Sequence, residues 1–155
     1  MPSTWIVSAN ASRARVFAQS RPADPLDEVS DLVNEASRLR DRDLETDAPV
    51  GERAASRSRN NVGASTTPST YEPKQSAKDR ETEAFARQVA EYLVKSHNEG
   101  RFEKLCLVAS PEFLGILRKL VDPRLHGAVT LEINKDYTQS TAQELRDHIR
   151  DHRMR

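Results

Sequence analysis

Two histidines have the spacing most suggestive of chemistry in this 155-residue chain. His148 and His152 lie four positions apart on a predicted helix, so their side chains could reach one metal ion. No cysteine lies near them, and the flanking Asp and Arg residues are typical of a solvated helix face. A metal centre also needs a fuller set of ligands than this pair supplies. We therefore predict no metal site and no small-molecule cofactor.

The other reactive side chains have structural interpretations. Cys106 lies in the middle of an apolar run, where a thiol packs in a core rather than acting as a nucleophile. A metal-dependent nuclease would need carboxylates at its strand ends, but Ser8, Asn10 and Ser110 stand there instead. The helix start at Ser110 could bind an anion, although Glu112 would repel a phosphate, so a capping role is favoured.

A local excess of positive charge lies between residues 51 and 80, which we call the basic segment. The whole chain is neutral, with 24 basic and 24 acidic residues, and so gives no general case for nucleic-acid binding. Residues 51–80 nevertheless hold six basic residues against three acidic ones; the basic residues are Arg53, Arg57, Arg59, Lys74, Lys78 and Arg80. These cations could bind phosphate groups, or they could simply keep the segment soluble, and residue types alone leave both readings open.

Residues 51–78 are also poor in apolar side chains. Ser, Thr, Asn, Gly, Pro and Ala dominate, and Val62 and Tyr71 are the only large apolar residues. Burial of so few apolar groups cannot offset the entropy lost when a segment becomes ordered. We predict a mobile, low-complexity loop at 51–78 within a single domain that spans residues 1–155.

The centre of the predicted fold is a strand that passes directly into a helix. Residues 105–109 form an unbroken apolar run, which indicates a strand covered on both faces. Ser110 and Pro111 then suit the N-cap and the first helical position. We expect Leu107 and Leu117 in the core, where replacement of either by Ala costs about 2–5 kcal/mol.

Further strands are expected on both sides of this unit. Residues 4–8 and 14–18 are predicted to pair antiparallel, because only a short turn separates them. Residues 128–133 form the last predicted strand. Residues 26–40 fit the period of a helix slightly better than that of a strand, so the residues alone do not decide.

Two further helices have clear start signals. Ser76 and Asp79 resemble a capping box, and the helix that follows ends near Gly100. Thr141 and Glu144 form a full capping box before the last helix. The order of elements predicts a single-domain α/β fold with a mixed sheet and helices packed on it.

Composition bounds the environment of the protein. One cysteine excludes an internal disulfide and fits a reducing compartment. The apolar run near the N-terminus is too short for a signal peptide, and no run reaches membrane-spanning length. We predict a cytoplasmic protein that does not contact membranes.

Five stretches, which cover most of the chain outside the predicted loop, carry a resemblance to a known family. They are TWIVSANASRARVFA, DLETDAPVGE, FARQVAEYL, LCLVASPEFLGILRKL and INKDYTQSTAQEL. Together they resemble the bacterial family of host attachment proteins, described as required for attachment to host cells. The family name rests on a phenotype and specifies no chemistry.

That family in turn resembles the middle domain of archaeal and eukaryotic class-1 peptide-chain release factors. The resemblance implies three strands, a long loop, a helix and two strand–helix pairs, and so favours a strand within 26–40. In release factors the loop carries Gly-Gly-Gln followed by Ser-Ala, and the glutamine reaches the peptidyl-transferase centre. Gln75, Ser76 and Ala77 match this motif, but Pro73 and Lys74 replace the glycines. These residues cannot cheaply adopt the backbone conformations that glycine permits.

Three functional hypotheses follow. The first is a non-enzymatic factor that binds the ribosome or another structured RNA through the basic segment, with Gln75 among the contacts. The second is an attachment or surface-interaction protein, as the family description says. The third is an esterase that acts on peptidyl-tRNA through Gln75, which the missing glycines disfavour.

Overall fold

The computed structural model describes residues 3–39 and 76–154. Within these ranges one sheet contains the strands β1 (Thr4–Ala9), β2 (Arg13–Gln19), β3 (Asp27–Val33), β4 (Lys104–Ala109) and β5 (Val129–Ile133). The strand order is β3-β2-β1-β4-β5. The strands β1, β4 and β5 run parallel, whereas β2 runs antiparallel to β1 and to β3. The predicted single-domain α/β fold with a mixed sheet is confirmed.

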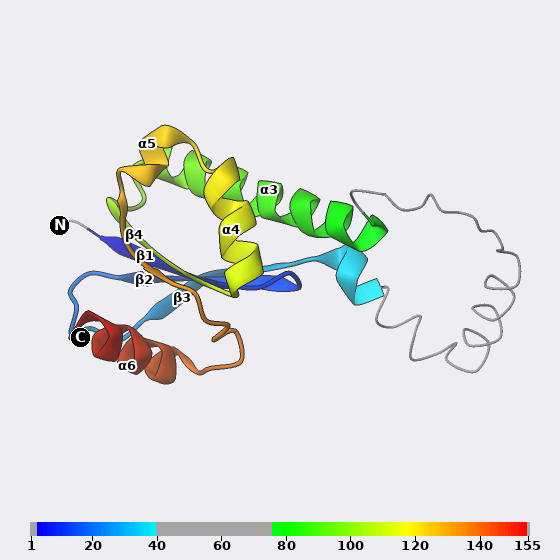
Figure 1. The fold of residues 1–155 in the computed structure, drawn as a ribbon. Helices are drawn as coiled ribbons and strands as arrows, with labels where there is room; N and C mark the ends of the chain where they lie inside the picture. The colour runs from blue at the N-terminus through cyan, green and yellow to red at the C-terminus, as the bar shows by residue number, and fades with distance from the viewer. Residues whose placement is uncertain (1–2, 40–75, 155) are drawn as a thin grey trace, which may run out of the picture.

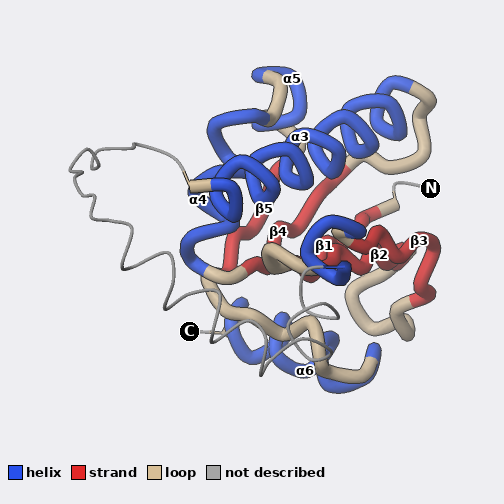
Figure 2. The backbone as a smooth tube through the Cα atoms, turned by 90° about the vertical axis from the view of Figure 1, so that its right-hand side faces the viewer, coloured by secondary structure: helices blue, strands red, loops and turns tan. Residues whose placement is uncertain are grey.

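Helices cover both faces of this sheet. The helices α3 (Ala77–Asn98), α4 (Pro111–Leu120) and α5 (Pro123–His126) lie on one face, and α6 (Ala142–Arg153) lies on the other (Figures 1 and 2). The molecule therefore has three layers, with the strands β1 and β4 in the middle of the middle layer.

The two central strands supply both cores because successive side chains point to opposite faces. Leu105 and Leu107 pack with α3 and α4, whereas Cys106 and Val108 pack with α6. Leu107 is 2% exposed and Leu117 of α4 is fully buried, so both are core residues as predicted. The apolar run of β4 is thus explained by burial on both sides.

The helix α3 begins and ends where local signals place its ends. Ser76 is the N-cap, and its hydroxyl accepts a hydrogen bond from the Asp79 backbone N–H at 3.1 Å. Past the last turn, Gly100 has a φ of +76°, a conformation that glycine adopts without strain. Since Ala77 and Lys78 are helical, the predicted loop boundary at 78 is wrong by two residues, and residues 51–75 of that loop lie outside the described ranges.

The ambiguous segment at 26–40 contains both alternatives. Its first part is the strand β3, and residues 35–39 are helical. The segment matched the periods of both a helix and a strand because it contains one short element of each type. Only Asn34 separates the strand from the helix. The short helix α5 directly after α4 was not predicted, and Asp122 caps it through the backbone N–H of Arg124 at 2.8 Å.

One predicted cap differs in detail. Ser110 occupies the N-cap position of α4, but its side chain makes no capping hydrogen bond. The Ser110 backbone carbonyl accepts the N–H of Leu114 at 2.8 Å. By contrast, the Thr141–Glu144 capping box of α6 is complete, with hydrogen bonds of 3.1 Å and 2.8 Å.

Candidate functional site

The parallel strands β1 and β4 end side by side at Ala9 and Ala109. In open α/β sheets, ligands bind outside the carboxyl ends of the strands. We call this end of the molecule the carboxyl edge. It comprises the β1–β2 turn at 10–12, the start of α4, the start of α3 and the segment 134–140.

A polar network joins the β1–β2 turn to segment 134–140. The Asn10 side-chain amide donates to a carboxylate oxygen of Asp136 at 2.9 Å and to the Thr138 hydroxyl at 3.2 Å. The Thr138 hydroxyl donates to the other Asp136 oxygen at 2.7 Å. The Asn10 carbonyl oxygen accepts the backbone N–H groups of Ser12 and Arg13 at 2.8 Å and 3.0 Å, so one side chain organises both segments.

The hydrogen bonds of this network stabilise the ionised form of Asp136. Burial would raise its pKa, but the hydrogen bonds from Asn10 and from the Thr138 hydroxyl and backbone outweigh burial and hold the pKa below its usual value. Asp136 is consequently a charged structural acceptor, and its environment is opposite to the one that a general acid needs.

Arg15 fastens the same segment to the sheet. Its guanidinium donates to the backbone carbonyls of Thr138 and Ser140 at 3.2 Å and 2.7 Å, and forms two 3.1 Å hydrogen bonds with Glu28 of β3. The hydrogen bonds to Glu28 raise the Arg15 pKa above its ordinary value despite partial burial. Arg15 thus holds the backbone of segment 134–140 with Nη1 and pairs with Glu28 through Nε and Nη2.

The described residues on either side of positions 40–75 also lie at the carboxyl edge. On the N-terminal side, Asn34 donates to the Ala11 carbonyl at 2.9 Å, and the Ser37 and Ser12 hydroxyls are 3.3 Å apart. On the C-terminal side, the first turns of α3 share a hollow of about 520 Å³ with Ala11 and α4. Residues 34–37 and the first turns of α3 therefore both lie beside the β1–β2 turn.

Of the predicted RNA-contacting residues, the structure describes two. Lys78 and Arg80 are exposed in the first turn of α3. The remaining predicted contacts lie outside the described residues: Arg53, Arg57, Arg59, Lys74 and Gln75. The hollow beside Lys78 is lined by charges of both signs, namely Lys78, Lys119, Asp79, Glu83 and Glu112.

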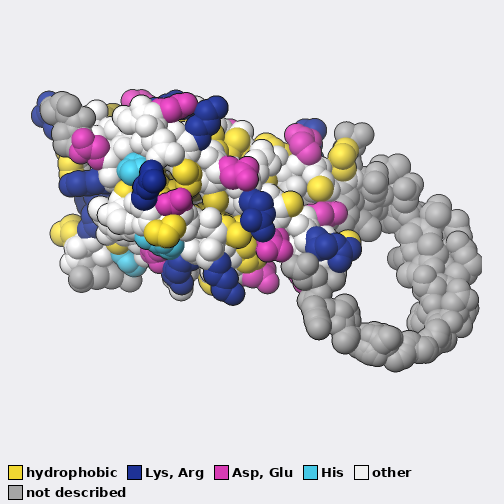
Figure 3. Space-filling view, turned by 90° about the horizontal axis from the view of Figure 1, so that it is seen from above, with side chains coloured by type: hydrophobic (Ala, Val, Ile, Leu, Met, Phe, Trp, Pro, Cys, Tyr) yellow, Lys and Arg dark blue, Asp and Glu magenta, His cyan; other side chains and the backbone are white. Residues whose placement is uncertain are grey.

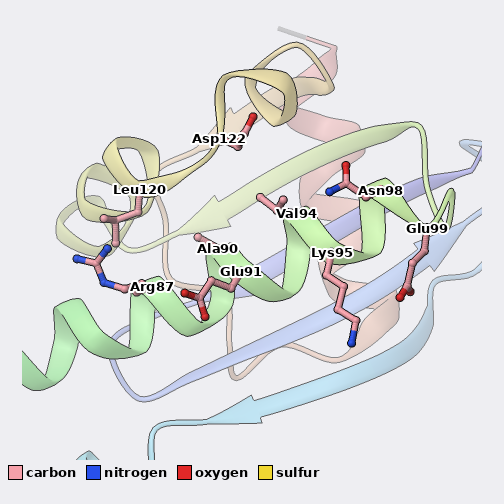
Figure 4. A pocket seen from close by; sticks show the side chains of 9 residues that line it. All are labelled: Arg87, Ala90, Glu91, Val94, Lys95, Asn98, Glu99, Leu120 and Asp122. Carbon is pink, nitrogen blue, oxygen red and sulfur yellow. The ribbon is translucent and has the colours of Figure 1, made fainter.

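A second hollow lies between α3 and the end of α4. Its volume is about 530 Å³, and Val94 and Asn98 of α3 point toward the turn that carries Asp122 (Figure 4). Cations and anions again alternate, with Arg87 and Lys95 beside Glu91 and Glu99. The space-filling view of this face shows the same mixture of signs (Figure 3), which does not favour a polyanion.

The structure shows the surroundings of His148 and Cys106. His148 stacks on Tyr137, with ring centroids 4.0 Å apart and planes at 8°. Within 3–39 and 76–154, no group of three or more His, Cys, Asp or Glu side chains is placed to hold a metal ion. Cys106 is fully buried, and burial raises the pKa of its thiol, which fits the predicted packing role.

Sequence reasoning did not identify the Asn10–Asp136–Thr138 network or the role of Arg15. Asn10 and Arg15 contact partners that lie 123 to 128 positions later in the chain, and no local pattern of residues predicts such pairs. The available signal was their location, because they lie in the first and last of the five stretches that carry the family resemblance.

The chain belongs to a known protein family. The family described as "Protein required for attachment to host cells" matches residues 5–149. An uncharacterized protein of Rickettsia prowazekii (strain Madrid E) is 38% identical over 77 residues, which cover 48% of this chain and 51% of that protein. The matched part thus spans about half the length of this relative.

Two solved structures align weakly with the chain. An archaeal protein aligns over 86% of this chain and 30% of its own length, with 9% identity and a TM-score of 0.42. The Ppx/GppA phosphatase of Aquifex aeolicus aligns over 86% of this chain and 35% of its own length, with 12% identity and a TM-score of 0.40. Likenesses this distant carry no functional argument. Separately, none of the described helices combines the length and apolarity needed to cross a bilayer.

Proposed function

We propose that this host-attachment-family protein is a non-enzymatic factor that associates with the ribosome or another structured RNA. The contacts would come from the basic segment, with Arg53, Arg57, Arg59, Lys74, Gln75, Lys78 and Arg80 as its residues. The observation that carries the proposal is that residues 34–37 and the first turns of α3, the described residues on either side of positions 40–75, both lie beside the β1–β2 turn at the carboxyl edge.

The described residues on either side of positions 40–75 are held by hydrogen bonds. The Asn34–Ala11 and Ser37–Ser12 contacts hold residues 34–37 against the β1–β2 turn, and the Ser76 cap sets the start of α3. Cations presented from one end of a rigid body can contact several phosphates of a folded RNA. Each phosphate contact releases counterions, so affinity of this kind falls steeply with salt.

The use of polar groups at the carboxyl edge supports a positioning role for this end of the body. The Asn10 side-chain NH2 group and Nη1 of Arg15 donate to segment 134–140. The release-factor resemblance supports an RNA partner through Gln75, Ser76 and Ala77. The replaced glycines argue against release chemistry at Gln75.

Co-sedimentation with ribosomes over a salt series tests the proposal. Wild type should pellet at low salt, and the Arg53→Ala/Arg57→Ala/Arg59→Ala variant should bind less and show a shallower salt dependence. The log–log slope should fall by roughly one unit per lost contact at most. A matched control removes three exposed cations from the α3–α5 face, by Arg87→Ala/Lys95→Ala/Arg124→Ala, and should pellet as wild type does.

Two further arms separate the alternatives. Gln75→Ala should change pelleting little, and neither wild type nor this variant should hydrolyse peptidyl-tRNA; hydrolysis that depends on Gln75 would support the esterase hypothesis instead. If wild type never pellets, or if the triple variant has an unchanged slope, RNA association is rejected. A role in attachment to host cells, favoured by the family description, would then be the leading hypothesis.

A further inference from the structure

A hollow at the opposite end of the sheet is lined by cations and, among the described residues, by no carboxylate. Its volume is about 450 Å³, within the range of roughly 300–1,000 Å³ typical of ligand sites. It lies where β1 and β4 begin and where β2 and α6 end, the end at which Figure 1 marks both termini. Its cations are Arg21, Lys104 and Arg153, and we call it the amino-edge pocket.

The charge of this pocket is not compensated locally. In the described part of the chain, none of the three cations forms an ion pair, although such pairs occur elsewhere on the surface. Arg153 donates from Nη2 to the Cys106 sulfur at 3.3 Å. Because burial raises the pKa of Cys106, this sulfur remains a neutral thiol and does not cancel the charge of Arg153.

The remaining polar lining suits a phosphate group. Thr4, Ser20 and Thr130 also line the hollow, and the Thr130 hydroxyl lies 3.9 Å from the Cys106 sulfur. Guanidinium, ammonium and hydroxyl groups are donors that phosphate oxygens accept well, and charge-assisted hydrogen bonds are the stronger ones. Three cations also match the charge of a phosphomonoester better than that of a singly charged carboxylate.

An apolar slot adjoins the pocket. It has a volume of about 120 Å³ and shares Gln19, Pro22 and Arg153 with the pocket. Its other lining residues are the apolar Leu26, Ile149 and Met154 together with Arg146 and Arg150. Nucleobases stack on apolar side chains and on the planes of Arg guanidinium groups.

We propose that the amino-edge pocket and its slot bind a nucleoside 5′-monophosphate, with the phosphate among the three cations and the base in the slot. The ligand chemistry is the same for a free nucleotide and for the 5′-phosphorylated end of an RNA. The proposal is independent of the RNA association proposed above, because the pocket lies at the other end of the sheet from the basic segment's flanks.

Titration of the full chain with AMP, followed by amide NMR and calorimetry, tests the site. AMP should shift the amide signals of Ser20, Arg21 and Lys104. AMP should bind about tenfold or more tightly than inorganic phosphate or adenosine, since each of these lacks half of the contacts. A 5′-phosphorylated oligoribonucleotide that binds more tightly than AMP, and than its 5′-hydroxyl counterpart, would identify an RNA end as the source.

Variants locate the binding. Arg21→Gln/Lys104→Gln replaces two exposed side chains and should weaken AMP binding about tenfold or more. Arg87→Gln/Lys95→Gln removes the same charge from the α3 groove and should leave AMP binding unchanged. The proposal is overturned if AMP at millimolar concentration leaves the three amides unshifted, if phosphate binds as tightly as AMP, or if both variants weaken binding equally.

Discussion

Single side chains at the carboxyl edge determine how segment 134–140 lies against the sheet. Asn10 is central because its one amide group serves two segments, donating to Asp136 and Thr138 while accepting from the turn after β1. Loss of a side chain of this kind leaves several hydrogen-bond partners unsatisfied at once. One such residue can therefore fix the geometry of two segments.

Asp136 should make the stability of this protein depend on pH in the acid range. Its pKa is lowered in the folded state, so its contribution is present above the unfolded pKa of about 3.9 and is lost as pH falls through the folded pKa. Asp136→Asn should therefore be less stable than wild type near pH 6, and the difference should shrink below about pH 4.

Urea unfolding at a series of pH values measures that difference. Asp27→Asn is a suitable control, since Asp27 is exposed on β3 and forms no ion pair within the described residues. A constant difference between wild type and Asp136→Asn from pH 7 to pH 3 would contradict the assigned role.

Ser8 and Thr138 offer a contrast between an unsatisfied and a satisfied buried hydroxyl. Ser8 is fully buried, and its hydroxyl has no hydrogen-bond partner among the described residues, whereas the buried Thr138 hydroxyl contacts Asn10 and Asp136. Ser8→Ala should leave the free energy of unfolding unchanged or raise it, and Thr138→Val should lower it by about 1–3 kcal/mol. Denaturant unfolding of both variants gives the answer; a marked loss for Ser8→Ala would mean that its hydroxyl is bonded in solution.

At the scale of elements, the helix caps should differ in how much they contribute to the free energy of unfolding. The α6 box makes two side-chain hydrogen bonds, whereas Ser110 makes none in front of α4. Thr141→Ala should therefore cost about 1 kcal/mol of unfolding free energy, and Ser110→Ala clearly less. Thermal and urea unfolding of the two single variants compare them directly, and equal losses would show that the Ser110 side chain caps α4 after all.

At the scale of the whole molecule, two ends of one sheet are proposed to bind different ligands. Because the carboxyl edge and the amino-edge pocket share no lining residue, the functions should be separable. Arg53→Ala/Arg57→Ala/Arg59→Ala should lose ribosome association and keep AMP binding, and Arg21→Gln/Lys104→Gln should do the reverse. Parallel pelleting and calorimetry of both variants test this; loss of both activities in either variant would indicate one continuous site.

Local features were predictable because residues a few positions apart produce them. The Ser76 start of α3, the capping box of α6 and the burial of β4 on both faces each follow from a short run of residue types. The family resemblance could also be recognised in the sequence, because it rests on five stretches of consecutive residues. The amino acid sequence by itself thus determined the order of most elements, their principal core residues and the family to which the chain belongs.

The tertiary structure decided which distant residues meet. Asn10 and Asp136 are 126 positions apart, and their contact exists only because β1 ends beside the segment that follows β5. The amino-edge pocket likewise needs Arg21, Lys104 and Arg153, which belong to three separate parts of the chain. Pairing at such distances is selected by burying a whole sheet between two layers of helices, and no local pattern of residues encodes that choice.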